Sequence, residues 1–354
     1  MQNILTKSEI LEYGKKGVKQ IFLEETPLMT DLAREELERL GMEIVVGAKA
    51  EAPGPRTGPS FSGMTAPRTA PSPGLTVRPA GSGGGYGGAA VYTGRGQKPL
   101  FKEVIRSDKK LVGTFVGTPH PVMTEYAGHL GFDFLCIDSE HNAMHLETVQ
   151  KMLQSLKHTP AYGMVRVPTL TYECVTGALD IGADALLIPQ IRTADDVVRL
   201  RSFSLYPPQG RRGVGPSRLW DYGDGLSGSG DMNRGTNIVI QLETVAAVEN
   251  IDDILKEAED FVDLLFVGPG DLSMDMGIFG QFTNPKLVDT ILYLREKTRA
   301  AGKRLGVFAG NFQAARSWFE KGFDMTVVNS ELALLGAAVS REMPALRTAI
   351  GEQN

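Results

Sequence analysis

Eight short apolar runs, rich in β-branched residues, recur along the chain after about residue 100. Segments with helical periodicity separate them, for example residues 145–159, 193–205 and 244–258. Alternation of buried strands with helices is typical of repeated βα units. Eight units in about 255 residues predict a (β/α)8 TIM barrel, an α/β fold, with a doubly wound open sheet as the alternative. The runs are residues 110–117, 132–138, 161–167, 183–189, 237–243, 262–268, 304–310 and 324–329.

A smaller unit precedes the eight repeats. Residues 20–25 and 42–46 read as short strands, and residues 26–41 between them read as a helix. Thr26 suits the N-cap, Pro27 the first helical position and Gly41 the position after the last turn. We therefore expect a small α/β head at residues 1–47, too small to cover the apolar side of its own helix. That side comprises Leu28, Met29, Leu32, Ala33, Leu37 and Leu40, opposite Asp31, Arg34 and Glu38.

The composition changes between the head and the repeats. Residues 48–98 are dominated by Pro, Gly, Ser, Thr and Ala, with scattered Arg. Such a stretch cannot bury enough apolar area to offset the entropy of ordering it. We expect a disordered linker at residues 48–98 and the barrel at residues 99–354.

Composition and charge narrow the class of partner. The 354 residues are 42% hydrophobic and 22% charged, and the net charge is -5 without a basic stripe, which argues against nucleic acid or an anionic membrane as partner. No apolar run reaches the roughly 18 residues of a membrane span, and no signal peptide is recognisable. Cys136 and Cys174 favour free thiols in a reducing compartment over a disulfide. We expect a cytoplasmic protein that binds a small molecule or another protein.

Polar residues follow the apolar runs at the ends where barrel enzymes carry their active sites. Glu243 and Asp271 provide hard anionic oxygens from neighbouring strands and leave coordination positions open, which favours Mg²⁺, Mn²⁺ or Co²⁺. The alternative is that each carboxylate caps the helix that follows it. The remaining members of this set are Asp138, Glu140, His141, Arg166, Gln190 and Gln241.

Two further side chains suggest how a substrate is handled. Arg166 is suited to a bidentate grip on a substrate carboxylate, although a structural pair with a neighbouring Glu is equally consistent. His141 is a candidate acid or base, with Asp138 three residues earlier able to fix its tautomer. A cation chelating the carboxylate and ketone of a 2-oxo acid would stabilise an enolate. These polar residues at the strand ends therefore predict cleavage of an aldol to pyruvate enolate and an aldehyde.

Seven motifs, in this order, resemble the HpcH/HpaI family of class II pyruvate aldolases. They are GTFVGTPHP, FLCIDSEHN, VRVP, ALLIPQI, YPPQGRRGVGPSR, IVIQLET and FVGPGDLSMDMG, and the resemblance covers about residues 100–345. It implies a (β/α)8 fold, a Mg²⁺, Mn²⁺ or Co²⁺ ion on Glu243 and Asp271, and Arg166 as the residue that holds the substrate carboxylate and polarises the ketone. His141 with Asp138 would then form the acid/base dyad.

The resemblance carries further implications. Gln241, Gly270 and Asp271 would lie at the metal or the substrate, and the loop of residues 206–218 would shape the rim. Members commonly form hexamers through exchanged C-terminal helices, which makes residues 329–350 an expected subunit contact. Two positions depart from the usual pattern, since Ser139 replaces a Gly and the metal loop reads GPGD instead of GPAD. Neither change removes a functional group.

The head has its own weak resemblance, to N-terminal extensions of enzymes housed in bacterial microcompartments. We therefore expect residues 1–47 to be an address that binds a shell or cargo partner, with folding back on the barrel or self-pairing as the alternative. For the whole chain the predicted function is a metal-dependent aldolase acting on a 4-hydroxy-2-oxo acid. The rival functions are a malyl-CoA or citryl-CoA type lyase and a non-catalytic scaffold.

Overall fold

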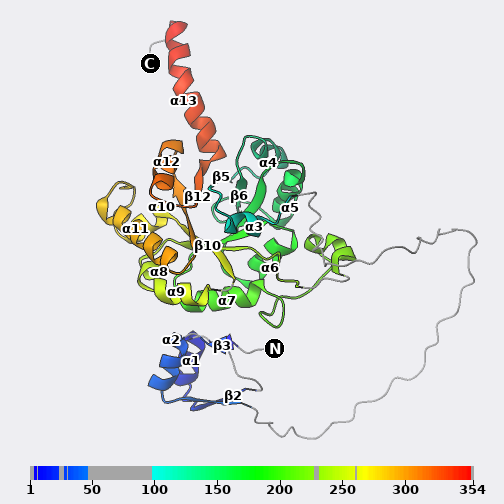
Figure 1. Ribbon diagram of the computed structural model, residues 1–354, viewed down its shortest axis with the longest axis vertical. Helices are drawn as coiled ribbons and strands as arrows, with labels where there is room; N and C mark the ends of the chain where they lie inside the picture. The colour runs from blue at the N-terminus through cyan, green and yellow to red at the C-terminus, as the bar shows by residue number, and fades with distance from the viewer. Residues whose placement is uncertain are drawn as a thin grey trace, which may run out of the picture.

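Eight parallel strands close into one barrel in the computed structural model, which describes residues 4–5, 7–23, 28–29, 31–46, 98–226, 231–259 and 261–351 (Figure 1). Each predicted run contains one strand, so the (β/α)8 barrel is confirmed and the open sheet is wrong. The strands are β5 (Leu111–Val116), β6 (Phe134–Asp138), β7 (Tyr162–Arg166), β8 (Ala185–Ile188), β9 (Ile238–Leu242), β10 (Val262–Val267), β11 (Arg304–Ala309) and β12 (Met325–Ser330). The barrel closes where β12 pairs with β5.

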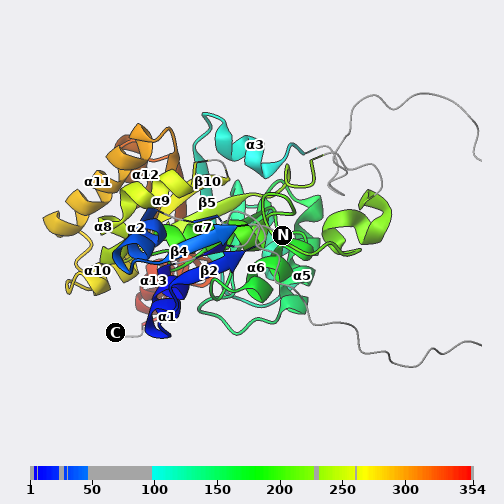
Figure 2. The same cartoon turned by 90° about the horizontal axis from the view of Figure 1, so that it is seen from below.

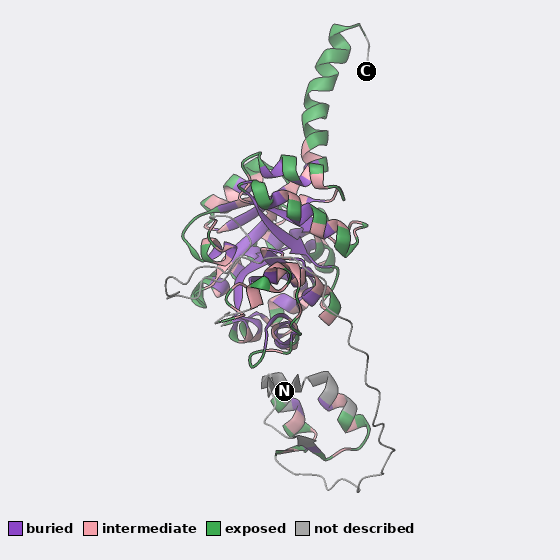
Figure 3. Cartoon of the chain, turned by 90° about the vertical axis from the view of Figure 1, so that its right-hand side faces the viewer, coloured by how far each residue is buried: buried purple, intermediate pink, exposed green. Residues whose placement is uncertain are grey.

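The strands are apolar on both faces because both faces are covered. On β6, Phe134 and Cys136 belong to the cluster inside the barrel, and the alternate residues Leu135 and Ile137 belong to the cluster beneath the helices. Figure 3 shows the strands buried at the centre and the exposed residues on the surrounding helices. Continuous apolar runs instead of alternating ones are therefore what this fold requires.

The helices form the outer layer. Many begin at a side-chain cap, and Thr193 with Asp196 forms a reciprocal capping box at α7. In Figure 2, α9, α11 and α12 lie to one side of β5 and β10, and α5 and α6 lie to the other. The layer comprises α4 (Pro121–Gly128), α5 (Leu146–Ser155), α6 (Tyr172–Asp180), α7 (Ala194–Ser204), α8 (Val245–Glu249), α9 (Ile251–Glu257), α10 (Pro269–Asp275), α11 (Pro285–Ala300) and α12 (Phe312–Glu320), with 3-10 segments at Leu156–His158 and Arg218–Leu226.

A short helix, α3 (Phe101–Arg106), covers the N-terminal end of the barrel. Phe101 is buried and stacks on Tyr162 with ring centroids 4.5 Å apart. Arg106 pairs with the buried carboxylate of Asp263 at 2.7 Å. Side chains therefore close the interior of the barrel at this end.

The last helix, α13 (Glu331–Ala349), extends away from the barrel (Figure 1). Six apolar side chains, five on α13 and one on the residue that caps its C-terminus, are 41–60% exposed at spacings of three and four residues, which places them on one helix face. They are Leu332, Leu335, Val339, Met343, Leu346 and Ile350.

The head contains two pairs of parallel strands and two helices. Its elements are β1 (Ile4–Leu5), α1 (Lys7–Lys15), β2 (Gln20–Leu23), β3 (Leu28–Met29), α2 (Asp31–Arg39) and β4 (Glu43–Val46). β1 pairs with β3, and β2 pairs with β4. Ile10, Ile21 and Met42 form a small core, against which Leu37 and Leu40 pack.

Several predictions for the head need correction. The helix begins at Asp31 and not near Pro27, and Leu28 and Met29 form a strand instead of a helix face. Thr26 and Pro27 lie outside the described residues. The helix α1, which the sequence pattern did not indicate, helps to build a small core against which Leu37 and Leu40, both half-buried, pack. That the head is too small to cover the whole apolar side of its helix stays a prediction.

Other predictions hold within the described residues. Gly41 has a φ of +59°, the left-handed conformation expected after a helix. Cys136 and Cys174 are free thiols, although Cys174 is only partly buried. None of the helices in the described segments is long and apolar enough to cross a membrane. The expected linker lies outside the described residues except for Lys98.

Candidate active site

The predicted polar residues gather at the C-terminal end of the barrel. Asp138 and Arg166 are the last residues of β6 and β7, and Gln241 lies near the end of β9. Glu243 follows β9 directly, and Gly270 and Asp271 lie in the first turn of α10, after β10. Parallel strands in a closed barrel bring all of these positions to one rim.

Arg166 and Asp138 form a buried bidentate ion pair. Nε of Arg166 donates to Oδ1 of Asp138 at 2.8 Å, and Nη2 donates to Oδ2 at 2.9 Å. The guanidinium also lies over the ring of Phe115, 4.5 Å from its centroid. Burial acts to raise the pKa of Asp138, but the hydrogen bonds and charge of Arg166 outweigh it, and the pKa is lowered. The structural pairing of Arg166 is thus present, with Asp138 as its main partner.

His141 has a different acidic neighbour from the one expected. Its Nε2 lies 3.7 Å from Oε2 of Glu140, and its side chain is 60% exposed. Asp138 accepts instead from Arg166, from the backbone N–H of Glu140 and from Nδ2 of Asn142. Among the described residues, no hydrogen bond joins Asp138 to His141. The acid/base dyad remains a prediction, with Glu140 as a second candidate partner.

Glu243 is held by its neighbours in a site with almost no solvent contact. Its side chain is 1% exposed, and Oε1 accepts the backbone N–H of Gln190 at 2.8 Å. Oε2 accepts from Nε2 of Gln241. Gln190 has a φ of +57°, a left-handed conformation that is uncommon for a residue with a side chain and is found at functional sites. This backbone geometry aims the N–H of Gln190 at the carboxylate.

The charge of Glu243 lacks full compensation. Burial raises the pKa of Glu243 to about 7; the N–H of Gln190 opposes the shift, and the carboxylates of Asp271 and Glu140 add to it. Three carboxylates thus act on one another at the rim, with Arg166 as the cation that opposes them. A divalent cation would remove this repulsion, and carboxylate oxygens are the donors that Mg²⁺ and Mn²⁺ prefer.

Helix capping does not explain the two predicted metal ligands. The helix after β9 is capped by Thr244, whose hydroxyl accepts from the N–H of Ala247 at 3.1 Å. Asp271 lies inside the first turn of α10, and that helix has no side-chain capping bond. The carboxylates of Glu243 and Asp271 are therefore available for another role.

From the sequence, Gly268 was missed and the way in which Gln190 acts in the site was not predicted. A Cβ atom at Gly268 would lie 2.8 Å from both Oε2 of Glu243 and Nε2 of Gln241, so any larger residue would have to shift these two side chains. Gln190 was recognised as a rim residue, but its backbone N–H is what contacts Glu243. The GPGD motif indicates the glycine at residue 268, whereas no sequence pattern indicates the contact made by the N–H of Gln190.

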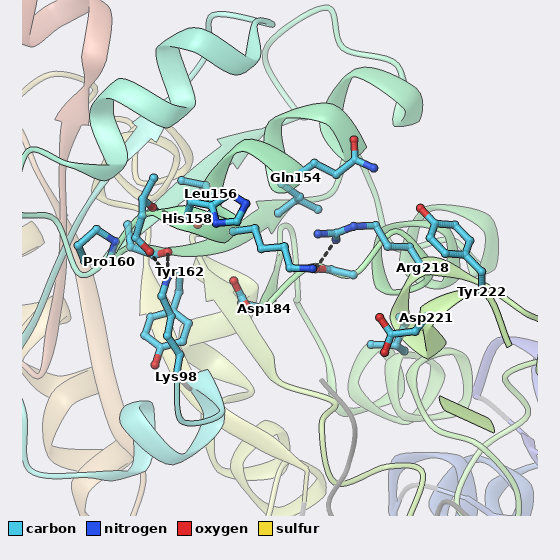
Figure 4. A pocket seen from close by; sticks show the side chains of 16 residues that line it. Lys98, Gln154, Leu156, His158, Pro160, Tyr162, Asp184, Arg218, Asp221 and Tyr222 are labelled. Atoms are coloured by element: carbon cyan, nitrogen blue, oxygen red, sulfur yellow. Dashed lines mark hydrogen bonds between the residues drawn. The ribbon is translucent and has the colours of Figure 1, made fainter. Parts of the chain in front are cut away.

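A cavity of about 690 Å³ lies at the other end of the barrel (Figure 4). Its walls include Tyr162, the first residue of β7, and Asp184, just before β8. Two of its cations, Lys98 and Arg218, donate to backbone carbonyls, those of Ala161 and Ile181 respectively. These two side chains are thus hydrogen-bonded to nearby backbone. None of the rim residues lines this cavity.

Part of the loop of residues 206–218 also lies near this end. It follows α7 and precedes β9, and Arg212 in it pairs with Asp180, the last residue of α6. Connections from a helix to the next strand run along the N-terminal end of the barrel. The N–H of Gly213, however, donates to the hydroxyl of Tyr172, the first residue of α6, so the loop contacts both ends of that helix. That the loop shapes the rim stays a prediction.

Comparison with known proteins agrees with this fold and site. A family profile described as HpcH/HpaI aldolase/citrate lyase matches residues 111–337. A 5-keto-4-deoxy-D-glucarate aldolase from Citrobacter koseri is 32% identical over 68% of this chain and 93% of its own length. A hydroxypyruvate/pyruvate aldolase from Agrobacterium fabrum is 33% identical over 66% of this chain and 87% of its own.

A solved structure shows the same architecture. An HpcH/HpaI aldolase/citrate lyase family protein from Burkholderia cenocepacia is 29% identical, with a TM-score of 0.64 over 70% of this chain and 98% of its own. The similarity to aldolases over the whole barrel identifies a carbon–carbon lyase of the aldolase type. The chain belongs to the HpcH/HpaI aldolase/citrate lyase family.

Proposed function

We propose that this protein is a metal-dependent aldolase that reversibly cleaves a 4-hydroxy-2-oxo acid to pyruvate, or a close 2-oxo acid, and an aldehyde. The observation that carries the proposal is the convergence of Glu243 and Asp271 beside the Arg166–Asp138 pair on one rim. The aldolases to which the chain is similar include one for 5-keto-4-deoxy-D-glucarate and one for hydroxypyruvate and pyruvate. The proposed substrate class follows from these two findings together.

The residues present fit a divalent cation. Glu243 and Asp271 would hold it, and Oε1 of Gln241 is a buried oxygen without a hydrogen-bond partner close to Glu243. Mg²⁺, Mn²⁺ or Co²⁺ bound there would supply Lewis acidity toward the ketone of the substrate. A site with two protein carboxylates leaves room for the substrate's own oxygens.

The remaining rim residues divide the other tasks. Arg166 presents a guanidinium, fixed in orientation by Asp138 and by the ring of Phe115, to the substrate carboxylate. Gln241 and Gly270 line the approach to the metal ligands. His141, exposed at the mouth of the site, would move a proton to or from the aldol hydroxyl.

A pyruvate-release assay tests the proposal directly. The panel comprises 4-hydroxy-2-oxo acids with different aldehyde halves, including 5-keto-4-deoxy-D-glucarate, together with malyl-CoA and citryl-CoA. Release of pyruvate that stops on chelation and returns with Mn²⁺, Co²⁺ or Mg²⁺ supports the aldolase. Full activity after exhaustive chelation, or cleavage of the CoA thioesters alone, contradicts it.

We also propose that the protein forms homo-oligomers, hexamers by the family resemblance, through α13. The exposed apolar face of α13 is continuous along most of the helix, and a monomer would leave it in water. A second copy of the chain can cover this face.

For the head we propose the address role, in the cytoplasm or inside a bacterial microcompartment. The head has its own small core, so it does not need the barrel to bury Leu37 and Leu40. Residues 1–47 fused to a fluorescent protein are expected to enter microcompartment shells in cells that produce them. Diffuse fluorescence in such cells would contradict the address role.

A further inference from the structure

All three nitrogens of the Arg166 guanidinium face carboxylates of the protein. Asp138 takes Nε and Nη2 through two hydrogen bonds, and Oε2 of Glu140 lies 3.0 Å from Nη1. Both ion pairs are largely buried. Asp138 uses two of the five N–H groups of the guanidinium, so a substrate carboxylate that approaches the N–H groups left on Nη1 and Nη2 meets the carboxylate of Glu140 beside Nη1.

The two partners are held differently. The bonds to Asp138 are aligned, and Asp138 is further fixed by the N–H of Glu140 and by Asn142. Oε2 of Glu140 is close to Nη1 but makes no aligned hydrogen bond, and it is a buried atom without a hydrogen-bond partner. The contact of Glu140 with Arg166 is thus the weaker one and the easier to replace.

The same oxygen has a second cationic partner within reach. Oε2 of Glu140 lies 3.7 Å from Nε2 of His141, slightly beyond hydrogen-bond distance. A small rotation of the Glu140 side chain would lengthen the contact with Arg166 and shorten the contact with His141. The carboxylate thus lies between the group proposed to hold the substrate and the group proposed to move its proton.

We propose that Glu140 is a positioning residue that occupies the substrate-carboxylate position on Nη1 of Arg166 and transfers to His141 when the substrate binds. This inference rests on the proposed function and gives Glu140 a role in it. In the free protein Glu140 competes with the substrate for Arg166. In the complex it orients His141, so that the acid/base group is in place when the substrate is bound.

The proposal predicts opposite effects on binding and on turnover. With Glu140→Gln the competing charge is lost, and pyruvate should bind the Mn²⁺-saturated protein about 3- to 10-fold more tightly, because a larger fraction of Arg166 is free. Turnover should fall about 10- to 100-fold, because a neutral amide orients His141 poorly. A merely structural role would weaken both.

The experiment measures pyruvate affinity by titration calorimetry and kcat and KM with a 4-hydroxy-2-oxo acid, all at saturating Mn²⁺. Asp275→Asn is the matched control, because it removes a carboxylate from α10 that accepts from the N–H of Val245 and contacts neither Arg166 nor His141. If Asp275→Asn tightens pyruvate binding as much as Glu140→Gln does, general charge explains the effect and the proposal is overturned. Glu140→Ala is measured as well, and the unfolding midpoint of each variant is determined. A variant with a normal midpoint has no folding defect, so its changes in pyruvate binding and turnover can be compared with the prediction.

The outcomes also separate this inference from the aldolase function. Wild-type protein that binds pyruvate but cleaves no substrate overturns the aldolase, while tighter pyruvate binding by Glu140→Gln still supports the exchange at Arg166. Cleavage by wild type with unchanged or weaker pyruvate binding by Glu140→Gln overturns the exchange alone. Wild type that binds no pyruvate with Mn²⁺ overturns both.

Discussion

Glu243 has almost no contact with water, and two other carboxylates act on it. Its pKa is about 7 in the folded protein, above the 4.5 of an unperturbed Glu. A raised folded-state pKa contributes stability that is present below pH 4.5 and is lost as the pH rises through 7. Without metal, the folded protein is therefore destabilised by this group at neutral and alkaline pH.

Glu243→Gln should remove that destabilisation. The difference in unfolding free energy between variant and wild type, in the presence of a chelator, should shift in favour of the variant by roughly 3 kcal/mol from pH 4 to pH 8. Mn²⁺ at pH 8 should stabilise wild type and not the variant. Denaturant unfolding at the two pH values measures both effects, and a difference that is independent of pH would contradict this account of Glu243.

Arg166→Lys tests the guanidinium itself. Lysine keeps the charge but cannot donate to both oxygens of Asp138 while presenting a further nitrogen to the substrate, so KM should rise and kcat should fall. We expect a combined loss in kcat/KM of about 100-fold or more. Arg316→Lys, on an exposed pair with Glu320, is the matched control and should leave steady-state kinetics unchanged.

Residue identities at the rim could be predicted, whereas their contacts could not. Strand ends fix which side chains reach the rim, so Asp138, Arg166 and Glu243 follow from the apolar runs alone. The partner of His141 depends on the turn after β6, which places Glu140 nearer than the expected Asp138. Spacing in the sequence does not determine the direction of a side chain in a turn.

At the scale of elements, α13 combines regular helix formation with an uncovered apolar face. Replacing Leu335 by Lys would place a charge in the middle of that face. If another copy covers the face, Leu335→Lys should reduce the molar mass in solution to that of a smaller species, because burying an unpaired charge is costly. Light scattering coupled to size-exclusion chromatography measures this mass.

The control for this prediction is Ala337→Lys, about 200° around the same helix from Leu335. This variant should retain the wild-type mass. Equal loss of mass in both variants would mean that the helix and not its apolar face is disturbed, and an unchanged mass in Leu335→Lys would contradict α13 as the subunit contact.

The strands of the barrel were easier to predict than the helices and strands of the head. Barrel strands buried on both faces give continuous apolar runs, which can be recognised without knowing which strands pair with each other. In the head, Leu28 and Met29 continue the helical periodicity of α2 but pair with β1, because tertiary pairing overrides a short local pattern.

At the scale of the whole molecule, the head and the barrel have separate cores. Deleting residues 1–97 should leave aldolase turnover and oligomeric mass nearly unchanged. The truncated chain keeps Lys98, whose Nζ donates to the carbonyl of Ala161. Kinetics and light scattering on the truncated protein check this expectation, and a collapse of activity would mean that the head takes part in catalysis.

The closure of the barrel affects where intermolecular β-pairing can start. Each of the eight strands has two neighbours, so the barrel offers no free strand edge. In the described part of the head, by contrast, each strand pairs with one other strand and has one edge without a strand partner. Free edges are templates for intermolecular β-pairing. Amyloid-like self-association on storage or mild heating should therefore start in the head, and the chain without residues 1–97 should stay clear for longer at equal concentration.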